Sequence, residues 1–243
     1  DLRSFLIGEV YSRVDVTNEI DFTAVFTDEV GIGNNSGGQG VELHRYFLFP
    51  TNDNATSLWL QKYTLINRIN RLIEVSSLVT PVDASEEAQL NSILAEARTL
   101  RAFSYLQLQA FYSPDMSDDN ALGVMLLDFV PNFDTALPRA TNAEIFEFME
   151  EDLLFAENNL TGSNSNYKYV TPALVDAIRA RMYVYRKNYV LAEQYALSAI
   201  STSGLSLSNP VQYNQMWSDS NRGEVIFAAS RPSAGTWGNI ASL

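Results

Sequence analysis

The longest unbroken stretch of helix-forming residues in the chain runs from Leu90 to Tyr112. It contains no Pro or Gly, and it predicts a helix of about 35 Å at the usual rise per residue. Apolar residues recur on two of its faces, formed by Leu90, Ile93, Leu94, Ala97, Tyr105, Leu108, Phe111 and Tyr112, and by Phe103, Leu106 and Ala110. A helix that is apolar on two faces must be covered on both. The pattern therefore predicts a central helix around which other helices pack.

One charged residue falls inside the first apolar face of this helix. A buried guanidinium is tolerated only where a carboxylate or backbone oxygens accept its hydrogen bonds, so Arg101 predicts such a partner nearby. We expect Arg101 to be structural rather than to contact a ligand. Asp83, ahead of Glu86 and Glu87, predicts the capped, negatively charged start of the same helix.

Further helices are predicted from the same periodicity. They are expected over residues 2–14, from an N-cap at Ser57 to about Val79, over 142–160, and after Thr171-Pro172. In the helix that starts at Ser57, Asn67 and Asn70 are expected to form hydrogen bonds with neighbouring backbone. Trp59 on its apolar face and Trp217 ahead of an apolar run are both expected in the core.

Residues 173–204 show the small-large-small spacing of a tetratricopeptide helical hairpin. The pattern consists of Ala180, Tyr183, Ala192, Ala196 and Ala199, with Gly204 beyond it. The small residues allow two antiparallel helices to approach closely, and Asn188-Tyr189 is the predicted turn. The helices near 86–112 and 142–160 are expected to form a second hairpin. The sequence thus predicts an all-α fold of tetratricopeptide-like hairpins with long irregular loops.

Several segments are predicted to be irregular. Gly31 to Gly40 holds five glycines and two asparagines, without the spacing of a nucleotide-binding loop. Glu42 to Pro50 is aromatic and is expected to be extended. Ser113 to Asn120 is acidic, but it lacks the alternating ligands of a calcium loop. The tail from Leu205 to Leu243 is rich in Ser and Asn and stops in irregular sequence. We therefore expect this end to be a cut within a longer chain.

Composition narrows the functional classes. The 243 residues carry a formal charge of −13, which disfavours nucleic acid and other polyanions as partners. There is no Cys, and hence neither a disulfide nor a cysteine metal ligand. The chain starts at Asp1 without a signal-peptide pattern, so we expect any signal peptide to have been trimmed or left out of this sequence. No apolar run approaches the length of a membrane-spanning helix.

Catalytic patterns are absent from the sequence. His44 is the single histidine, and neither GxSxG nor HExxH occurs, which argues against serine-hydrolase and zinc chemistry. Among 29 acidic residues some carboxylates pair by chance, so such pairs are no evidence for glycoside hydrolysis. We expect no enzyme activity, no cofactor and no metal site. Binding without turnover is the favoured interpretation.

The sequence of residues 95–112, AEARTLRAFSYLQLQAFY, resembles the signature helix of the SusD/RagB family of outer-membrane glycan-capture lipoproteins. Further matches follow the family's order along the chain: Trp59, Tyr63, Ile66 and Asn70; Pro138 to Thr141; Glu151 to Leu153 with Ala156; Val170-Thr171; Ala180, Arg181 and Tyr183; Tyr189 with Ala192; and Glu224 to Phe227. The resemblance implies one helical SusD-like domain over residues 1–243 that lacks much of the family's C-terminal half.

The resemblance also implies a function. Members of the family capture oligo- or polysaccharides at the outer-membrane surface, where a lipid anchors them, and deliver the glycans to a TonB-dependent transporter for nutrient uptake. No binding residue of the family carries over by motif. The alternative from the repeat pattern alone is a tetratricopeptide-type scaffold that binds peptides or proteins.

Candidate glycan contacts therefore rest on physical suitability. Sugars bind where an exposed aromatic face lies beside amides and charged groups, and loops can expose such groups without disrupting a helix. The residues that meet this description are Asn34, Asn35, His44, Arg45, Tyr46 and Trp237. The alternative is a flexible connector in which Tyr46 packs inward.

Overall fold

The computed structural model describes residues 1–27, 29–161, 166–218 and 220–229. Most of them are helical, in the order α1 Leu2–Phe5, a π-helical turn η1 Leu6–Val10, a 3-10 turn η2 Tyr11–Arg13, α2 Thr17–Phe26, α3 Val41–His44, α4 Asp53–Ser76, α5 Ala84–Tyr112, α6 Asn142–Asn159, α7 Pro172–Tyr185, α8 Tyr189–Ser203 and α9 Pro210–Trp217. Two short antiparallel strands, β1 Leu122–Met125 and β2 Arg139–Thr141, separate α5 from α6. The fold is all-α and tetratricopeptide-like, as the sequence predicts.

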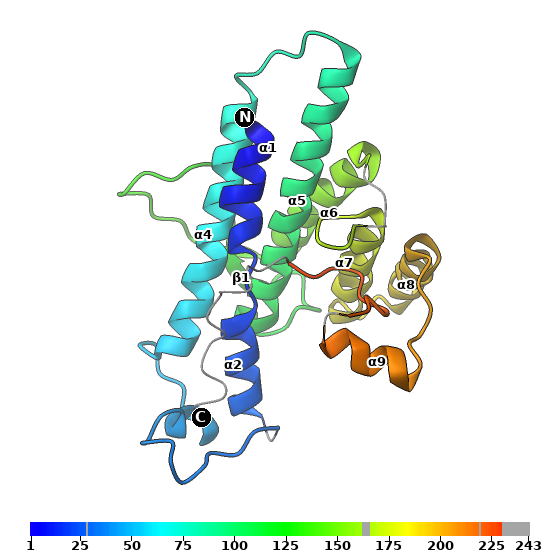
Figure 1. Cartoon of the computed structure of the whole chain (residues 1–243). Coiled ribbons are helices and arrows are strands. Elements are labelled where there is room, and N and C mark those ends of the chain that lie inside the picture. The colour runs from blue at the N-terminus through cyan, green and yellow to red at the C-terminus, as the bar shows by residue number, and fades with distance from the viewer. Residues whose placement is uncertain (28, 162–165, 219, 230–243) are drawn as a thin grey trace.

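The helix α5 lies at the centre of the fold, with α4 on one side and α6 on the other (Figure 1). Its middle turns are fully buried, including Leu100, Tyr105 and Leu108. The helix begins six residues before Leu90 because the Asp83 side chain accepts a hydrogen bond from the Glu86 backbone N at 2.8 Å. The predicted central helix and its cap are both confirmed.

The helix α4 differs from its prediction at the start. Asn52, not Ser57, is the N-cap, because its side chain accepts hydrogen bonds from the backbone of Asn54 and Ala55. Asn70 bonds to backbone as expected, donating to the carbonyls of Leu127 and Phe129 at 2.9 and 3.0 Å. Asn67 does not follow the prediction, since its buried Oδ1 has no hydrogen-bond partner among the described residues.

The N-terminal segment packs along α4, but it is not one regular helix (Figure 1). The expected helix over 2–14 breaks into α1, a π-helical turn and a 3-10 turn around Gly8. The Glu96 side chain on α5 holds this segment, accepting hydrogen bonds from Arg3 and from the Tyr11 hydroxyl. The following α2 is a regular helix.

The helices α7 and α8 pack against each other across a three-residue turn, with Ala192 and Ala199 buried between them. The turn covers 186–188, one residue earlier than predicted: Asn188 caps α8 and Tyr189 is its first residue. Lys187 takes the left-handed conformation at φ +58°, and the Asn188 backbone N bonds to Tyr183 O. The helices α5 and α6 also pack together, as expected for the second hairpin.

The tail departs most from the expectation. It forms the short helix α9 in a region predicted to be irregular, because Asn209 and Gln212 form a reciprocal capping box around Pro210. Trp217 ends this helix with 78% of its surface exposed, so its expected core position is wrong. Trp59 is half-buried and meets Tyr112 edge-on, as a residue at the border of the core. In the described part of the chain, no helix is both long and apolar enough to cross a membrane.

Candidate functional site

The connection between α2 and α4 holds five of the six candidate residues. It leaves the helical body at the end of α2 and returns at Asn52, with only the single turn α3 inside it (Figure 1). Gly37, Gly38 and Gly40 have φ of 62°, 87° and 71°, which a side chain would strain. The irregular loop predicted over 31–40 is confirmed, and left-handed Gly40 is the residue from which α3 starts.

The end of α3 fixes the backbone of Tyr46. The Tyr46 N donates to Leu43 O at 3.0 Å and the Phe47 N donates to Glu42 O at 2.9 Å. This pair of bonds is the Schellman motif, in which the residue after the helix adopts the left-handed conformation that usually selects Gly. Tyr46 occupies that position with φ +62°. The chain therefore turns sharply at Tyr46, and residues 42–50 are not the extended segment that their aromatic content suggested.

Tyr46 is both exposed and anchored. Its side chain is 61% exposed, and one edge of its ring meets Phe26 at 5.2 Å between centroids. Phe26 stacks on Phe22, which meets Phe111 of the central helix edge-on. The aromatic series connects the loop to the end of α5. Tyr46 thus keeps most of its ring free, rather than packing inward as the connector interpretation required.

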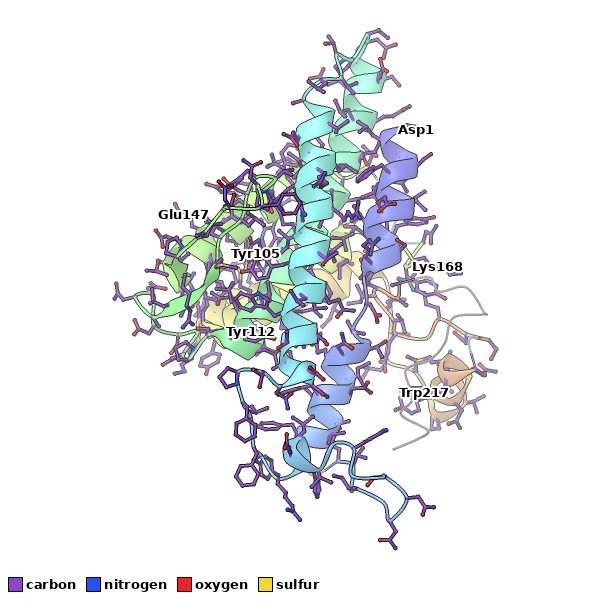
Figure 2. The ribbon with its side chains drawn as sticks, turned by 90° about the vertical axis from the view of Figure 1, so that its left-hand side faces the viewer. Asp1, Tyr105, Tyr112, Glu147, Lys168 and Trp217 are labelled. Atoms are coloured by element: carbon purple, nitrogen blue, oxygen red, sulfur yellow. The ribbon has the colours of Figure 1, made fainter. Side chains whose placement is uncertain are left out.

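The residues after Tyr46 add apolar surface that the sequence analysis did not select. Phe47, Leu48 and Phe49 are all exposed. Figure 2 shows this loop at the end of the molecule opposite the α4–α5 connection. Four successive exposed apolar or aromatic residues are unusual, since large apolar side chains commonly pack inside. The signal that could have identified them is the run of aromatics between a glycine-rich loop and Pro50.

The remaining candidates differ in their exposure. Asn34, Asn35 and Arg45 are exposed, whereas His44 is half-buried and its Nδ1 has no hydrogen-bond partner in the described part of the chain. Trp237 lies outside the described residues. The structure thus places five candidates in the connection between α2 and α4, and four of them are exposed.

The loop is an open surface rather than a deep cavity. A hollow of about 10 Å³ lies between the loop and α2, lined by Val25, Val30, Gly31, Ile32, Ser36, Gln39 and Gly40. That volume admits one water molecule. A sugar ring would have to bind on the outer surface, against the exposed aromatic side chains. No group of three or more His, Cys, Asp or Glu suited to a metal ion occurs among the residues that the structure describes.

Comparison with known proteins adds sequence and structural relatives. No family model matches the chain. It is 25% identical over 197 residues to a SusD-like protein of Bacteroides ovatus, a match that covers 76% of this chain and 34% of the relative. The chain therefore spans about a third of the length of this curated relative.

Solved structures share the fold over nearly the whole chain. A SusD superfamily protein from Bacteroides vulgatus superposes with a TM-score of 0.76 at 19% identity, covering 98% of this chain and 56% of that one. A second structure, solved with a xylogluco-oligosaccharide, gives a TM-score of 0.73 at 19% identity and covers 97% of this chain and 47% of its own. The resemblance found in the sequence and the arrangement of the helices agree.

Proposed function

We propose that this chain, whose sequence and fold are similar to those of SusD-like proteins, binds an oligo- or polysaccharide without turning it over. The observation that carries the proposal is the related structure with a xylogluco-oligosaccharide, whose fold this chain matches over 97% of its residues. The loop between α2 and α4 offers the surface chemistry that such a ligand needs. Its exposed aromatic residues supply apolar faces for sugar C–H groups, and its exposed amides and Arg45 supply hydrogen bonds to hydroxyls.

Within this proposal, Tyr46 is the principal stacking residue. The Schellman motif and the contact with Phe26 hold its ring, which lowers the entropy lost when a sugar stacks on it. Asn34, Asn35, His44 and Arg45 are the proposed polar contacts, and Trp237 is a further aromatic contact. The net charge of −13 favours neutral glycans over anionic ones.

The proposal extends to the cellular setting that the family resemblance implies. The protein would stand at the outer-membrane surface on a lipid anchor and deliver its glycan to a TonB-dependent transporter for nutrient uptake. Co-purification of a TonB-dependent transporter from outer membranes supports this part. Recovery in a cytoplasmic complex instead would favour the scaffold interpretation of the helical hairpins.

A glycan array followed by calorimetry on the protein carrying this chain tests the binding site. Tyr46→Ala is expected to weaken binding at least tenfold while the melting temperature changes little, because the ring is mostly exposed. Phe133→Ala, which removes an exposed aromatic from a different loop, is the matched control. Unchanged affinity in Tyr46→Ala, or weakening of the same size in Phe133→Ala, would remove the loop as the site. Absence of any glycan ligand would remove the function itself.

A further inference from the structure

The α4–α5 connection exposes a compact group of aliphatic side chains. Val75, Leu78, Val79 and Val82 are all exposed, and Leu78 and Val82 expose 82% and 87% of their surface. We refer to these four residues as the apolar tip. Figure 1 shows the α4–α5 connection and the first turns of α5 beyond the ends of α1 and α4, so the apolar tip stands at one end of the helical bundle.

The backbone of the apolar tip is held by local hydrogen bonds. Leu78 N donates to Val75 O at 3.2 Å and Val79 N to Ser76 O at 3.1 Å. On the α5 side, Val82 N donates to the Glu86 carboxylate and Glu86 N donates to the Asp83 carboxylate, each at 2.8 Å. Pro81 fixes the backbone between them. The side chains are therefore presented on a preorganised turn, which lowers the entropy lost on binding.

The charged residues that flank the apolar tip are mostly acidic, and the nearest basic residue in the sequence is Arg71, one turn before Val75 on α4. Residues 72–97 contain no Lys, Arg or His and five acidic residues. Of these, Glu96 pairs with Arg3 on the bundle side. The other four, Glu74, Asp83, Glu86 and Glu87, pair with no basic side chain in the part of the chain that the structure describes. An apolar centre with an acidic rim is complementary to an apolar pocket with a basic rim.

We propose that the apolar tip docks into an apolar pocket of a partner protein whose rim carries Lys and Arg side chains. A second copy is disfavoured, because two acidic rims repel each other. Anionic lipid headgroups are disfavoured for the same reason. The apolar tip lies at the end of the molecule opposite the α2–α4 loop (Figure 2), so this partner and a ligand on the loop can bind together. The inference does not rest on glycan binding.

Photocrosslinking in the native host identifies what the apolar tip touches. Benzoylphenylalanine is placed at Leu78, and at Ile200 as the control, because Ile200 is an exposed aliphatic residue on α8. The expected result is a crosslink to one protein from position 78 and not from position 200. Crosslinks to lipid or to a second copy, or no crosslink at all, overturn the proposal.

The partner protein that the crosslink identifies is then purified. Its affinity is measured for the unmodified protein that carries the apolar tip and for two variants of that protein. Leu78→Ser with Val82→Ser should weaken binding at least tenfold, and Ile200→Ser should not. Raising the salt concentration from about 0.05 to 0.5 M should weaken binding at least threefold, because the rim charges are screened. Equal affinities for both variants, or binding that salt leaves unchanged, overturn the proposal. Circular dichroism checks that the variants remain folded.

Discussion

Arg101 and Asp152 form a two-bond ion pair inside the bundle. Arg101 Nε donates to Asp152 Oδ2 and Nη2 donates to Oδ1, each at 2.8 Å. Both residues are buried, and the remaining Arg101 Nη1 donates to Asn70 Oδ1 at 2.7 Å. Because Asn70 also binds the carbonyls of Leu127 and Phe129, one network joins α4, α5, α6 and the chain after β1.

Replacement of Asp152 by Asn should destabilise the protein strongly. It leaves the buried Arg101 guanidinium without its counter-charge, at an expected cost of about 3–5 kcal/mol in the free energy of unfolding. Urea unfolding measures this quantity. The double variant Arg101→Met with Asp152→Leu removes both charges and should recover a large part of the loss. A loss below about 1 kcal/mol in Asp152→Asn would contradict the role given to the pair.

Replacement of Ala192 by Leu tests the contact between α7 and α8. Ala192 is buried where the two helices meet, so the larger side chain should overpack the contact and cost about 1–3 kcal/mol. Gln194→Leu, on an exposed position of the same helix, is the control. Equal urea midpoints for both variants would contradict the close approach. Ala180 is only half-buried, so Ala180→Leu should cost less than Ala192→Leu.

Replacement of Lys187 by Gly should stabilise the protein. Lys187 has φ +58°, a conformation that costs a residue with a Cβ about 1–2 kcal/mol. The greater freedom of Gly in the unfolded chain offsets part of the gain, which leaves about 0.5–1 kcal/mol. Lys187→Ala is the control, since it also loses the hydrogen bond from Nζ to Ser117 but keeps the Cβ. A midpoint for the Gly variant no higher than that of the Ala variant would contradict the prediction.

The helical core was predictable because its signals are local and redundant. The apolar faces of α5, the Asp83 cap and the buried position of Arg101 all follow from spacing and residue type. The requirement that Arg101 have a partner followed from the cost of burying a charge, although the identity of Asp152 did not. That identity depends on how α6 lies against α5, which a pattern within one helix does not contain.

The errors have equally physical causes. Trp217 was expected in the core because apolar area favours burial, but it ends the short helix α9, where its ring meets the ring of Tyr213 edge-on within the same helix. Ser57 is a favourable cap residue by type, yet Asn52, five residues earlier, caps α4. In the candidate site, the loop itself was predicted from its glycines. The left-handed Tyr46 and the exposed Phe47 and Phe49 were not, because Tyr at that backbone position is uncommon.

The buried tyrosines should make the fold sensitive to alkaline pH. The Tyr11 hydroxyl bonds to Glu96 and accepts from Val170 N, and the Tyr105 hydroxyl bonds to the Leu127 backbone. Burial raises the pKa of both hydroxyls well above the ordinary value of 10.0, and it raises the pKa of Tyr112 to about 12. Above pH 10 the unfolded chain loses these protons while the folded chain keeps them, so the unfolded state is favoured.

The stabilisation should therefore be fully present below pH 10 and fall as pH rises further. Each of Tyr11 and Tyr105 is expected to contribute a slope of at most about 1.4 kcal/mol per pH unit in the free energy of unfolding. Urea unfolding between pH 8 and pH 11.5 measures that slope for the unmodified protein and for Tyr11→Phe with Tyr105→Phe. The double variant should be less stable at pH 8, because it leaves Glu96 and the Leu127 backbone without their partners. Its slope above pH 10 should nevertheless be shallower, since two of the titrating groups are gone, and equal slopes would show that these hydroxyls do not resist ionisation in the fold.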